Sequence, residues 1–170
     1  MWPFDKEQKL PGIKIDSQGK LMFELTEEEK LEVRKVFDML KGPDGEYIAR
    51  EEAVDEIRRG LTAMGLFNYA KDRILFSGFD SNKNKKHELI EKAIASIAKA
   101  HAFCPLPIFM YDLACFMEMN GRAVDAKEAF RTFLKLQKEF RATQYQETLF
   151  IALGRDISEA IKDAENRVKY

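Results

Sequence analysis

Apolar residues recur every three to four positions along most of the chain beyond Thr26, with polar and charged residues between them. This spacing gathers the apolar side chains on one face of an α-helix. The pattern predicts helices over residues 26–41, 50–64 and 68–77, and a fourth that is capped at Asn84. Four more are expected over 107–120, 125–140, 143–153 and 157–170. The connections are short, so neighbouring helices should run antiparallel.

The first 25 residues follow a different pattern. Two short β-prone runs lie on either side of residues 16–19, and Gly19 can supply the positive φ that a hairpin loop needs. A lone hairpin is marginally stable in water, so this arm should dock on the helices. Trp2 and Phe4 are the residues that we expect to help it dock.

Three helix starts carry the pattern of a capping box, in which two side chains satisfy free backbone amides reciprocally. Thr26 with Glu29 forms the first. The others are Asp125 with Glu128 and Asp156 with Glu159. Gly42 and Pro43 should end the first helix, because glycine tolerates a left-handed cap and proline cannot continue the hydrogen-bond ladder.

Charge and composition narrow the classes of partner. The chain has 170 residues and a net charge of −1, and no basic block or stripe appears, so we expect no nucleic-acid partner. No apolar run approaches the ~20 residues of a membrane span, and we expect no membrane partner. The start lacks the pattern of a signal peptide, which favours the cytoplasm. Cys104 and Cys115 should then stay reduced as small core residues.

One polar stretch, "DSNKNKKHELIE" from Asp80, raises the question of calcium. Asp80, Asn82, Asn84 and Glu91 occupy the first, third, fifth and twelfth places of a twelve-residue loop. Together with an upstream segment, whose loop would be residues 41–52, the region of about residues 25–102 resembles a degenerate pair of EF-hands. The resemblance implies a calcium-responsive module with these four residues as ligands.

Departures from that pattern weigh against a metal. Lys41, Pro43 and Gly45 stand where the first loop needs oxygen ligands. In the second loop Lys85 replaces the glycine of the sharp turn, which costs ~1–2 kcal/mol in a left-handed conformation. Neighbouring lysines repel a cation as well. We therefore expect no metal and no other cofactor, and interpret residues 80–84 as a polar connection followed by a helix cap.

A second stretch, "MYDLACFMEMNGRAVDAKEAFRTFLKL", resembles a tetratricopeptide repeat. Leu113 and Ala114 fall where the repeat has its Leu-Gly pair, and Gly121 takes the place of the turn glycine. Ala126 and Phe130 match the small and aromatic positions of the second helix. The small residues let two helix backbones approach closely, and Phe130 fills the space beside them. Weaker matches on either side extend the resemblance over about residues 68–170.

These patterns together predict the fold class and the domains. We expect an all-α protein of stacked antiparallel helical hairpins, tetratricopeptide-like, with a short N-terminal β-hairpin arm. The arm covers residues 1–25, a helix-loop-helix covers 26–66, and the repeats cover 67–170. A non-repeating bundle of the same helices is the alternative.

The resemblance implies a non-catalytic protein- or peptide-binding module, such as an adaptor or a chaperone. In such repeats the first helix of each hairpin lines the partner groove, which here means Ile108, Tyr111, Asp112, Cys115 and Met119. That lining favours an apolar segment. The alternatives are the calcium-responsive module and a small secretion-chaperone-like protein, and self-association remains open.

Catalytic patterns do not appear in the sequence. His87 and His101 are too far apart on one predicted helix to share a metal, and Asp112 and Glu118 are not placed as a catalytic pair and read as exposed surface charge. Neither a phosphate-binding glycine loop nor a hydrolase or metalloprotease motif is present. We therefore expect a protein that is not an enzyme.

Overall fold

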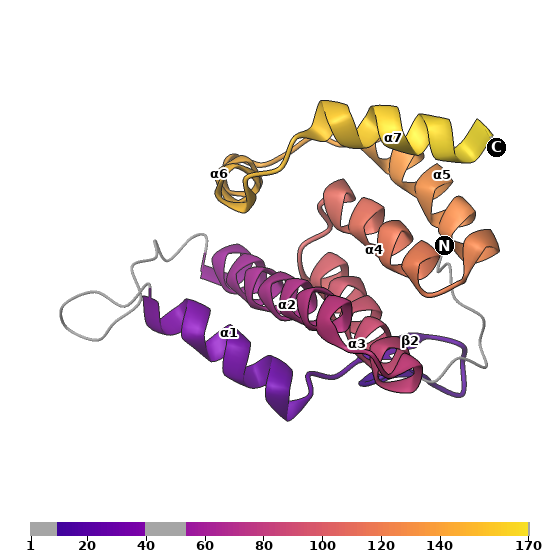
Figure 1. Ribbon diagram of the computed structural model, residues 1–170. Helices are drawn as coiled ribbons and strands as arrows, with labels where there is room; N and C mark the ends of the chain where they lie inside the picture. The colour runs from indigo at the N-terminus through magenta and orange to yellow at the C-terminus, as the bar shows by residue number, and fades with distance from the viewer. Residues whose placement is uncertain (1–9, 40–53, 170) are drawn as a thin grey trace.

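The computed structural model describes residues 10–39 and 54–169, whose arrangement Figure 1 shows. An antiparallel pair of strands, β1 (Ile13–Ile15) and β2 (Leu21–Phe23), precedes the helices. Seven helices make up most of these described residues: α1 (Glu27–Met39), α2 (Val54–Phe79), α3 (Lys83–Phe103), α4 (Pro107–Met119), α5 (Ala123–Glu139), α6 (Gln144–Leu153) and α7 (Ile157–Lys169). The predicted all-α class with an N-terminal β-hairpin is therefore confirmed.

The hairpin forms at the predicted place. Ile13 lies opposite Phe23, and the turn is held by the Asp16 carboxylate, which accepts hydrogen bonds from the backbone amides of Gln18 and Lys20. Gly19 has a φ of 79°, a conformation that favours glycine. Trp2 and Phe4 lie outside the described residues, as does the predicted end of the first helix at residues 42–43.

Helix α2 corrects the prediction of two helices over residues 50–64 and 68–77. The chain continues as a helix through Gly65, where a side chain would meet the backbone of Val33 on α1. A second glycine of α2, Gly60, packs against the ring of Tyr145 on α6. These glycines mark close crossings of helices and not a break. The predicted domain boundary at residues 66–67 consequently falls inside α2, where Leu66 belongs to the core.

Two helix starts also differ from the prediction. The N-cap of α3 is Asn82 and not Asn84, and its side chain accepts hydrogen bonds from the amides of Asn84 and Lys85. Helix α5 begins at Ala123 without a side-chain cap, so the predicted box of Asp125 with Glu128 is wrong. The chain reverses at Gly121, with a φ of 80°, and the helix resumes two residues later, which leaves Asp125 already in the first turn.

Helices α4 and α5 form the predicted antiparallel hairpin. Ala114, Ala126 and Phe130 are all buried where the two helices pack, as the sequence pattern indicated. The ring of Phe130 lies with its centroid 5.8 Å from that of Tyr111 on α4. The thiols of Cys104 and Cys115 are free, and only Cys104 is fully buried.

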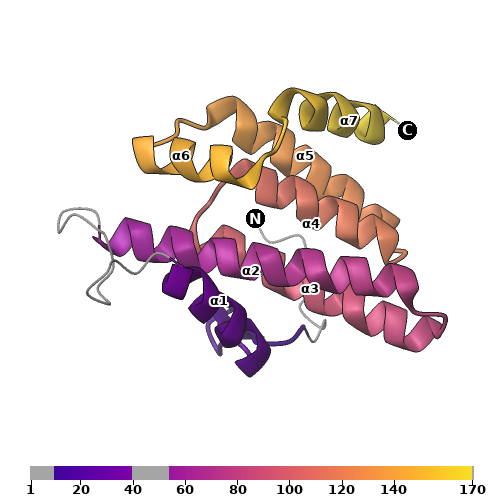
Figure 2. The same ribbon diagram turned by 60° about the vertical axis from the view of Figure 1, so that its left-hand side comes forward.

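The last two helices exist as predicted, but they do not pair with each other. Helix α7 packs on α5 and α4, whereas α6 packs on α2, and the two diverge in both ribbon views (Figures 1 and 2). Asp156 caps α7 by accepting from the amides of Ser158 and Glu159, which is half of the predicted box. Tyr145 draws α6 toward α2, because its hydroxyl donates to the carbonyl of Ile57 at 3.2 Å.

Buried apolar residues from α2 to α7 form one continuous core, which also includes Leu10 ahead of the hairpin. Helices α2 and α3 pack along their length and lie between α1 on one side and the α4–α5 hairpin on the other (Figure 2). In the part of the chain that the structure describes, no helix is long and apolar enough to cross a membrane.

Candidate functional site

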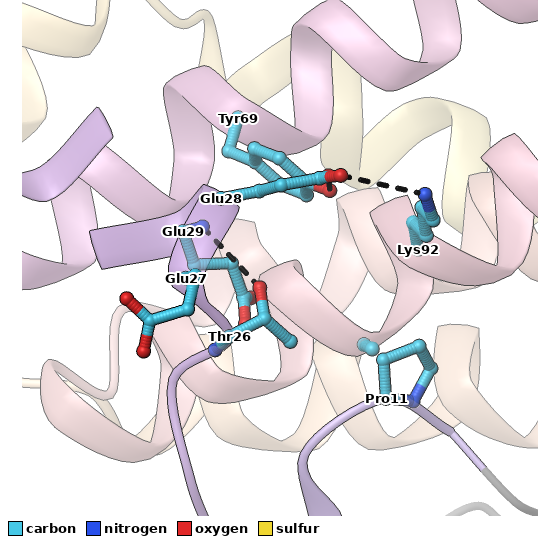
Figure 3. A pocket seen from close by; sticks show the side chains of 8 residues that line it. Pro11, Thr26, Glu27, Glu28, Glu29, Tyr69 and Lys92 are labelled. Atoms are coloured by element: carbon cyan, nitrogen blue, oxygen red, sulfur yellow. Dashed lines mark hydrogen bonds and ion pairs between the residues drawn. The ribbon is translucent and has the colours of Figure 1, made fainter. Parts of the chain in front are cut away.

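A polar pocket of about 290 Å³ opens where the arm and the start of α1 meet α2 and α3. It is the site drawn in Figure 3, with Pro11 from the arm, Tyr69 from α2 and Lys92 from α3 around the first turn of α1. Three consecutive glutamates of that turn, residues 27–29, line it together with Thr26. The pocket thus combines carboxylates, a phenol and an ammonium group.

Glu29 is the buried carboxylate of this site. It completes the predicted capping box, since Thr26 N donates to Glu29 Oε1 at 2.9 Å and Glu29 N donates to Thr26 Oγ1 at 3.3 Å. The same carboxylate receives the ammonium of Lys99 and the hydroxyl of Ser96, both on α3. Glu29 is 1% exposed and Lys99 is 0% exposed. A charged pair therefore lies entirely out of water, and this is tolerable only because each group has partners.

Glu28 is the second anchor of the pocket. Its carboxylate accepts a hydrogen bond from Tyr69 and lies 3.8 Å from the Lys92 ammonium, as Figure 3 shows, and 3.9 Å from Arg73. The hydrogen bond from Tyr69 lowers the pKa of Glu28, and burial together with Glu28 raises the pKa of Tyr69. Both shifts favour a carboxylate bonded to a neutral phenol, which is the arrangement of a fixed contact and not of a proton shuttle.

Sequence reasoning identified Thr26 and Glu29 only as a helix cap, and it did not identify Lys99 at all. The signal was present in the stretch "IASIAKAHA", where Lys99 stands within an apolar run of a buried helix. A lysine is almost never fully buried unless it is paired. That rule required an acidic partner, although it could not indicate which one.

The residues of the possible calcium loop do not form one twelve-residue loop in the structure, because α3 begins at Lys83. Three residues connect α2 to α3, and the helix is already under way at Asn84. The Asp80 carboxylate accepts from the amide of Asn82, while Glu91 accepts from Asn120 Nδ2 at 2.6 Å and lies 3.4 Å from Arg122. Within residues 10–39 and 54–169, His, Cys, Asp and Glu nowhere gather in threes that could hold a metal ion. The upstream loop, residues 41–52, lies outside the described residues.

Helix α7 and the turn before it cover most of the predicted partner groove. Ile108 and Asp112 are buried, and Arg155 reaches Asp112 Oδ2 at 2.7 Å. Tyr111 donates a hydrogen bond to Asp163 on α7 at 2.7 Å, and Cys115 lies half-buried beside it. Met119 is the exposed member of the five. The expectation that Asp112 is an exposed charge is wrong, because α7 and the turn before it pack over this face of α4. Glu118, on the same helix, is exposed and pairs with Arg167.

A second concave surface lies beside the N-terminal end of α4. The side chains around it come from the start of α4, the end of α5, α6 and the first turn of α7, and they enclose about 310 Å³. The lining residues are Leu106, Pro107, Ile108, Gln137, Phe140, Ala142, Gln146, Glu147, Phe150, Ile151 and Ile157. We call this the α4–α7 pocket. Its size is at the lower end of the range for ligand pockets.

The α4–α7 pocket is largely apolar. Among the described residues that line it, Glu147 alone is charged, and the Gln146 side chain is occupied by the cap of α6, where it accepts from the amide of Thr143. Ile151 lines the mouth and is 77% exposed, so the apolar surface extends out of the pocket. Of the five predicted groove residues, Ile108 alone contributes to this wall. The pocket exists because α6 diverges from α7, which the sequence pattern did not indicate.

Comparison of the chain with protein-family models, with curated proteins and with solved structures finds no significant match. The resemblances to tetratricopeptide repeats and to EF-hands therefore rest on the residues quoted above. The function has to be argued from the two pockets and from the surface of the molecule.

Proposed function

We propose that this protein is a non-catalytic binding module that takes a short apolar segment of another protein into the α4–α7 pocket. The observation that carries the proposal is the pocket's lining. Phe140, Phe150 and Ile157 provide an apolar wall, and exposed Ile151 extends it at the mouth. Concave apolar sites with few polar groups are the usual form of a binding pocket.

The side chains that line the pocket indicate what kind of partner segment fits it. A large apolar side chain fills the pocket, and a lysine or arginine next to it in the partner meets the carboxylate of Glu147. A central apolar anchor with a polar rim is the arrangement of most binding hot spots. Under this proposal the partner binds at the N-terminal end of α4 and not at the face that α7 covers. An adaptor or a chaperone-like protein would use such a site.

The polar pocket is the weaker candidate. Its charged groups already have partners, since Glu28 pairs with Lys92, Glu29 with Lys99 and Glu27 with Lys30. We interpret it as the joint that fixes α1 and the arm to α2 and α3. A cytoplasmic location is part of the proposal, because the free thiols of Cys104 and Cys115 suit a reducing compartment.

The test selects ligands without assuming a natural partner. A displayed library of short random peptides, panned against the folded chain, should enrich sequences with a large apolar residue beside lysine or arginine. Enriched peptides should bind Ile151→Asp at least about tenfold more weakly, since the change adds a second carboxylate beside Glu147 at an apolar mouth. Ala142→Trp, which narrows the pocket, should weaken the same peptides.

The matched control is Val124→Asp, which alters an equally exposed apolar side chain on α5. It should leave peptide affinity unchanged, and circular dichroism should show that all three variants are folded. Enrichment of peptides without an apolar anchor contradicts the proposal. So does peptide binding that Ile151→Asp and Ala142→Trp leave at full strength in folded protein.

A further inference from the structure

The connection between α2 and α3 forms one end of the molecule (Figure 2). Leu75, Phe76 and Phe79 from the last turns of α2 are all exposed, and Phe79 is 81% exposed. Monomeric proteins seldom expose large apolar side chains together unless the patch binds something. We call residues 75–87 the α2–α3 tip.

Exposed lysines follow these apolar side chains along the chain. Lys83, Lys85 and Lys86 lie in the first turn of α3, which three residues separate from the end of α2, and all three are exposed. Among the described residues none of the three has an ion pair or a hydrogen bond through its ammonium group. The acidic residues nearby are Asp80, whose carboxylate caps the amide of Asn82, and exposed Glu88. The local positive excess contrasts with the net charge of −1 for the whole chain.

We propose that the α2–α3 tip binds the surface of a membrane that contains anionic lipids. Exposed phenylalanine and leucine insert at the boundary between headgroups and acyl chains, while neighbouring lysines attract acidic headgroups. The apolar side chains and the lysines lie on either side of one three-residue connection at the same end of the molecule, so one flat membrane surface can meet both. In this arrangement the tip lies at the surface of the membrane and does not cross the bilayer.

The shape and the residue types favour a lipid surface over a protein partner. Phe79 projects from the end of a helical hairpin, whereas the hot spots of protein interfaces sit in packed pockets. Protein interfaces are depleted in lysine and use arginine, but a flexible, strongly hydrated ammonium suits headgroups that lie at varying positions. The cytoplasmic leaflet carries such acidic lipids, which agrees with the cytoplasmic location proposed above.

This inference replaces the expectation that no membrane is a partner. That expectation rested on the lack of an apolar run long enough to cross a bilayer, and a peripheral contact needs no such run. It is independent of the peptide proposal, since the α4–α7 pocket and the tip share no residue. A vesicle assay contains no protein ligand, so its outcome does not depend on what fills the pocket.

The experiment is cosedimentation of the intact chain with vesicles of phosphatidylcholine alone and with vesicles that also contain phosphatidylserine. The chain should bind the phosphatidylserine vesicles, and binding should fall when salt is raised from about 0.1 M to about 1 M, because the screening length shortens from ~10 Å to ~3 Å. Phosphatidylcholine vesicles should bind little.

Two variants separate the contribution of the apolar side chains to vesicle binding from the contribution of the lysines. Phe79→Ser should lower the partition coefficient about tenfold or more, as expected for one inserted aromatic side chain. Replacing Lys83, Lys85 and Lys86 by Gln should lower it by on the order of 100-fold, since each lysine contributes roughly fivefold. All the altered side chains are exposed, so folding should be unaffected.

Matched controls lie on other surfaces. Val124→Ser removes an exposed apolar side chain, and replacing exposed Lys135, Lys138 and Lys162 by Gln removes the same charge elsewhere. Both should bind vesicles as the unaltered chain does. Equal binding to both kinds of vesicle, no binding to either, or equal losses in the tip variants and their controls would each overturn the proposal.

Discussion

Helices α1 and α7 are both docked on other helices of the molecule, but their polar contacts are of different kinds. Each docks on two other helices, α1 on α2 and α3 and α7 on α4 and α5, and each has few fully buried residues. Only Val36 and Glu29 of α1 are fully buried, and only Ala160 and Ala164 of α7. Partly buried apolar residues such as Val33 of α1 and Ile161 of α7 also pack on the core, and polar contacts add to that packing.

The two sets of polar contacts differ in their exposure to water. The pair of Glu29 and Lys99 under α1 is fully buried, whereas Arg167 of α7 and its partner Glu118 are both exposed. Removing charges from water is expensive, and their attraction offsets that cost only when the geometry is good and every group has a partner. The α1 contacts are therefore fragile to the loss of one member, and the exposed contacts of α7 should tolerate such a loss.

The largest effect is expected when the buried pair is broken. Lys99→Met leaves the Glu29 carboxylate buried without its counter-ion and should lower the free energy of unfolding by ~3–5 kcal/mol. Urea denaturation followed by circular dichroism measures this. Replacing both residues, with Glu29→Gln and Lys99→Met together, should cost less than the single change, because no charge then remains buried and Gln can still complete the capping box.

Lys92→Met is the matched control for that change. Lys92 is a lysine of the same helix that lies 3.8 Å from a glutamate of the same turn, but its side chain is partly exposed. Its loss should cost less than ~1 kcal/mol. If the Lys99 and Lys92 variants are equally stable, then loss of a partner costs no more in a buried contact than in an exposed one, and the inference is wrong.

The packing beneath α7 provides the second test. Phe130 is fully buried and contacts the ring of Tyr111. Phe130→Ala should cost ~3–5 kcal/mol through lost contacts and the cavity left behind. The substitution acts on the α4–α5 hairpin, so it should loosen α7 while α1 stays docked. Hydrogen exchange that rises first in α1 would contradict this view of two separate attachments.

In both regions the sequence predicts the contacts between neighbours in the chain and misses the distant ones. Contacts between neighbours in the chain were predictable, because Thr26 with Glu29, the hairpin turn at Asp16 and the packing of Phe130 each follow from a local pattern. Lys99 meets Glu29 across 70 residues of sequence, and Arg155 meets Asp112 across 43. No local pattern specifies such pairs. The single helix α2 was missed for a related reason, since Gly65 resembles a break until the crossing of α1 is known.

Arg155 and Asp112 give a pH-dependent test of the α7 side. Burial raises the pKa of Asp112 above its ordinary value of 3.8, and the hydrogen bond from Arg155 counteracts part of that rise. Arg155→Met should raise this pKa further and cost ~1–3 kcal/mol near neutral pH, where a buried carboxylate has lost its partner.

The sign of the pH effect follows from the raised pKa. Folded protein takes up the proton more readily than unfolded protein, so stability is lost as pH rises through the folded-state pKa and regained as pH falls toward 3.8. The deficit of Arg155→Met relative to the unaltered chain should therefore be smaller at about pH 5 than at about pH 7. Adding Asp112→Asn should remove that dependence. A deficit that grows as the pH falls rules out this assignment.

The smallest effects should come from the two tyrosines that hold the docking helices. Tyr69 donates to Glu28 of α1, and Tyr111 donates to Asp163 of α7 at 2.7 Å. Each carboxylate keeps a cationic neighbour when its tyrosine is changed, Lys92 in one case and Arg167 in the other. Tyr69→Phe and Tyr111→Phe should therefore each cost ~0.5–1.5 kcal/mol, the net value of one hydrogen bond. The two contacts share no residue, so the double variant should equal the sum within about 0.5 kcal/mol. A larger departure from additivity would mean that α1 and α7 are coupled through the core, and that the molecule does not attach them independently.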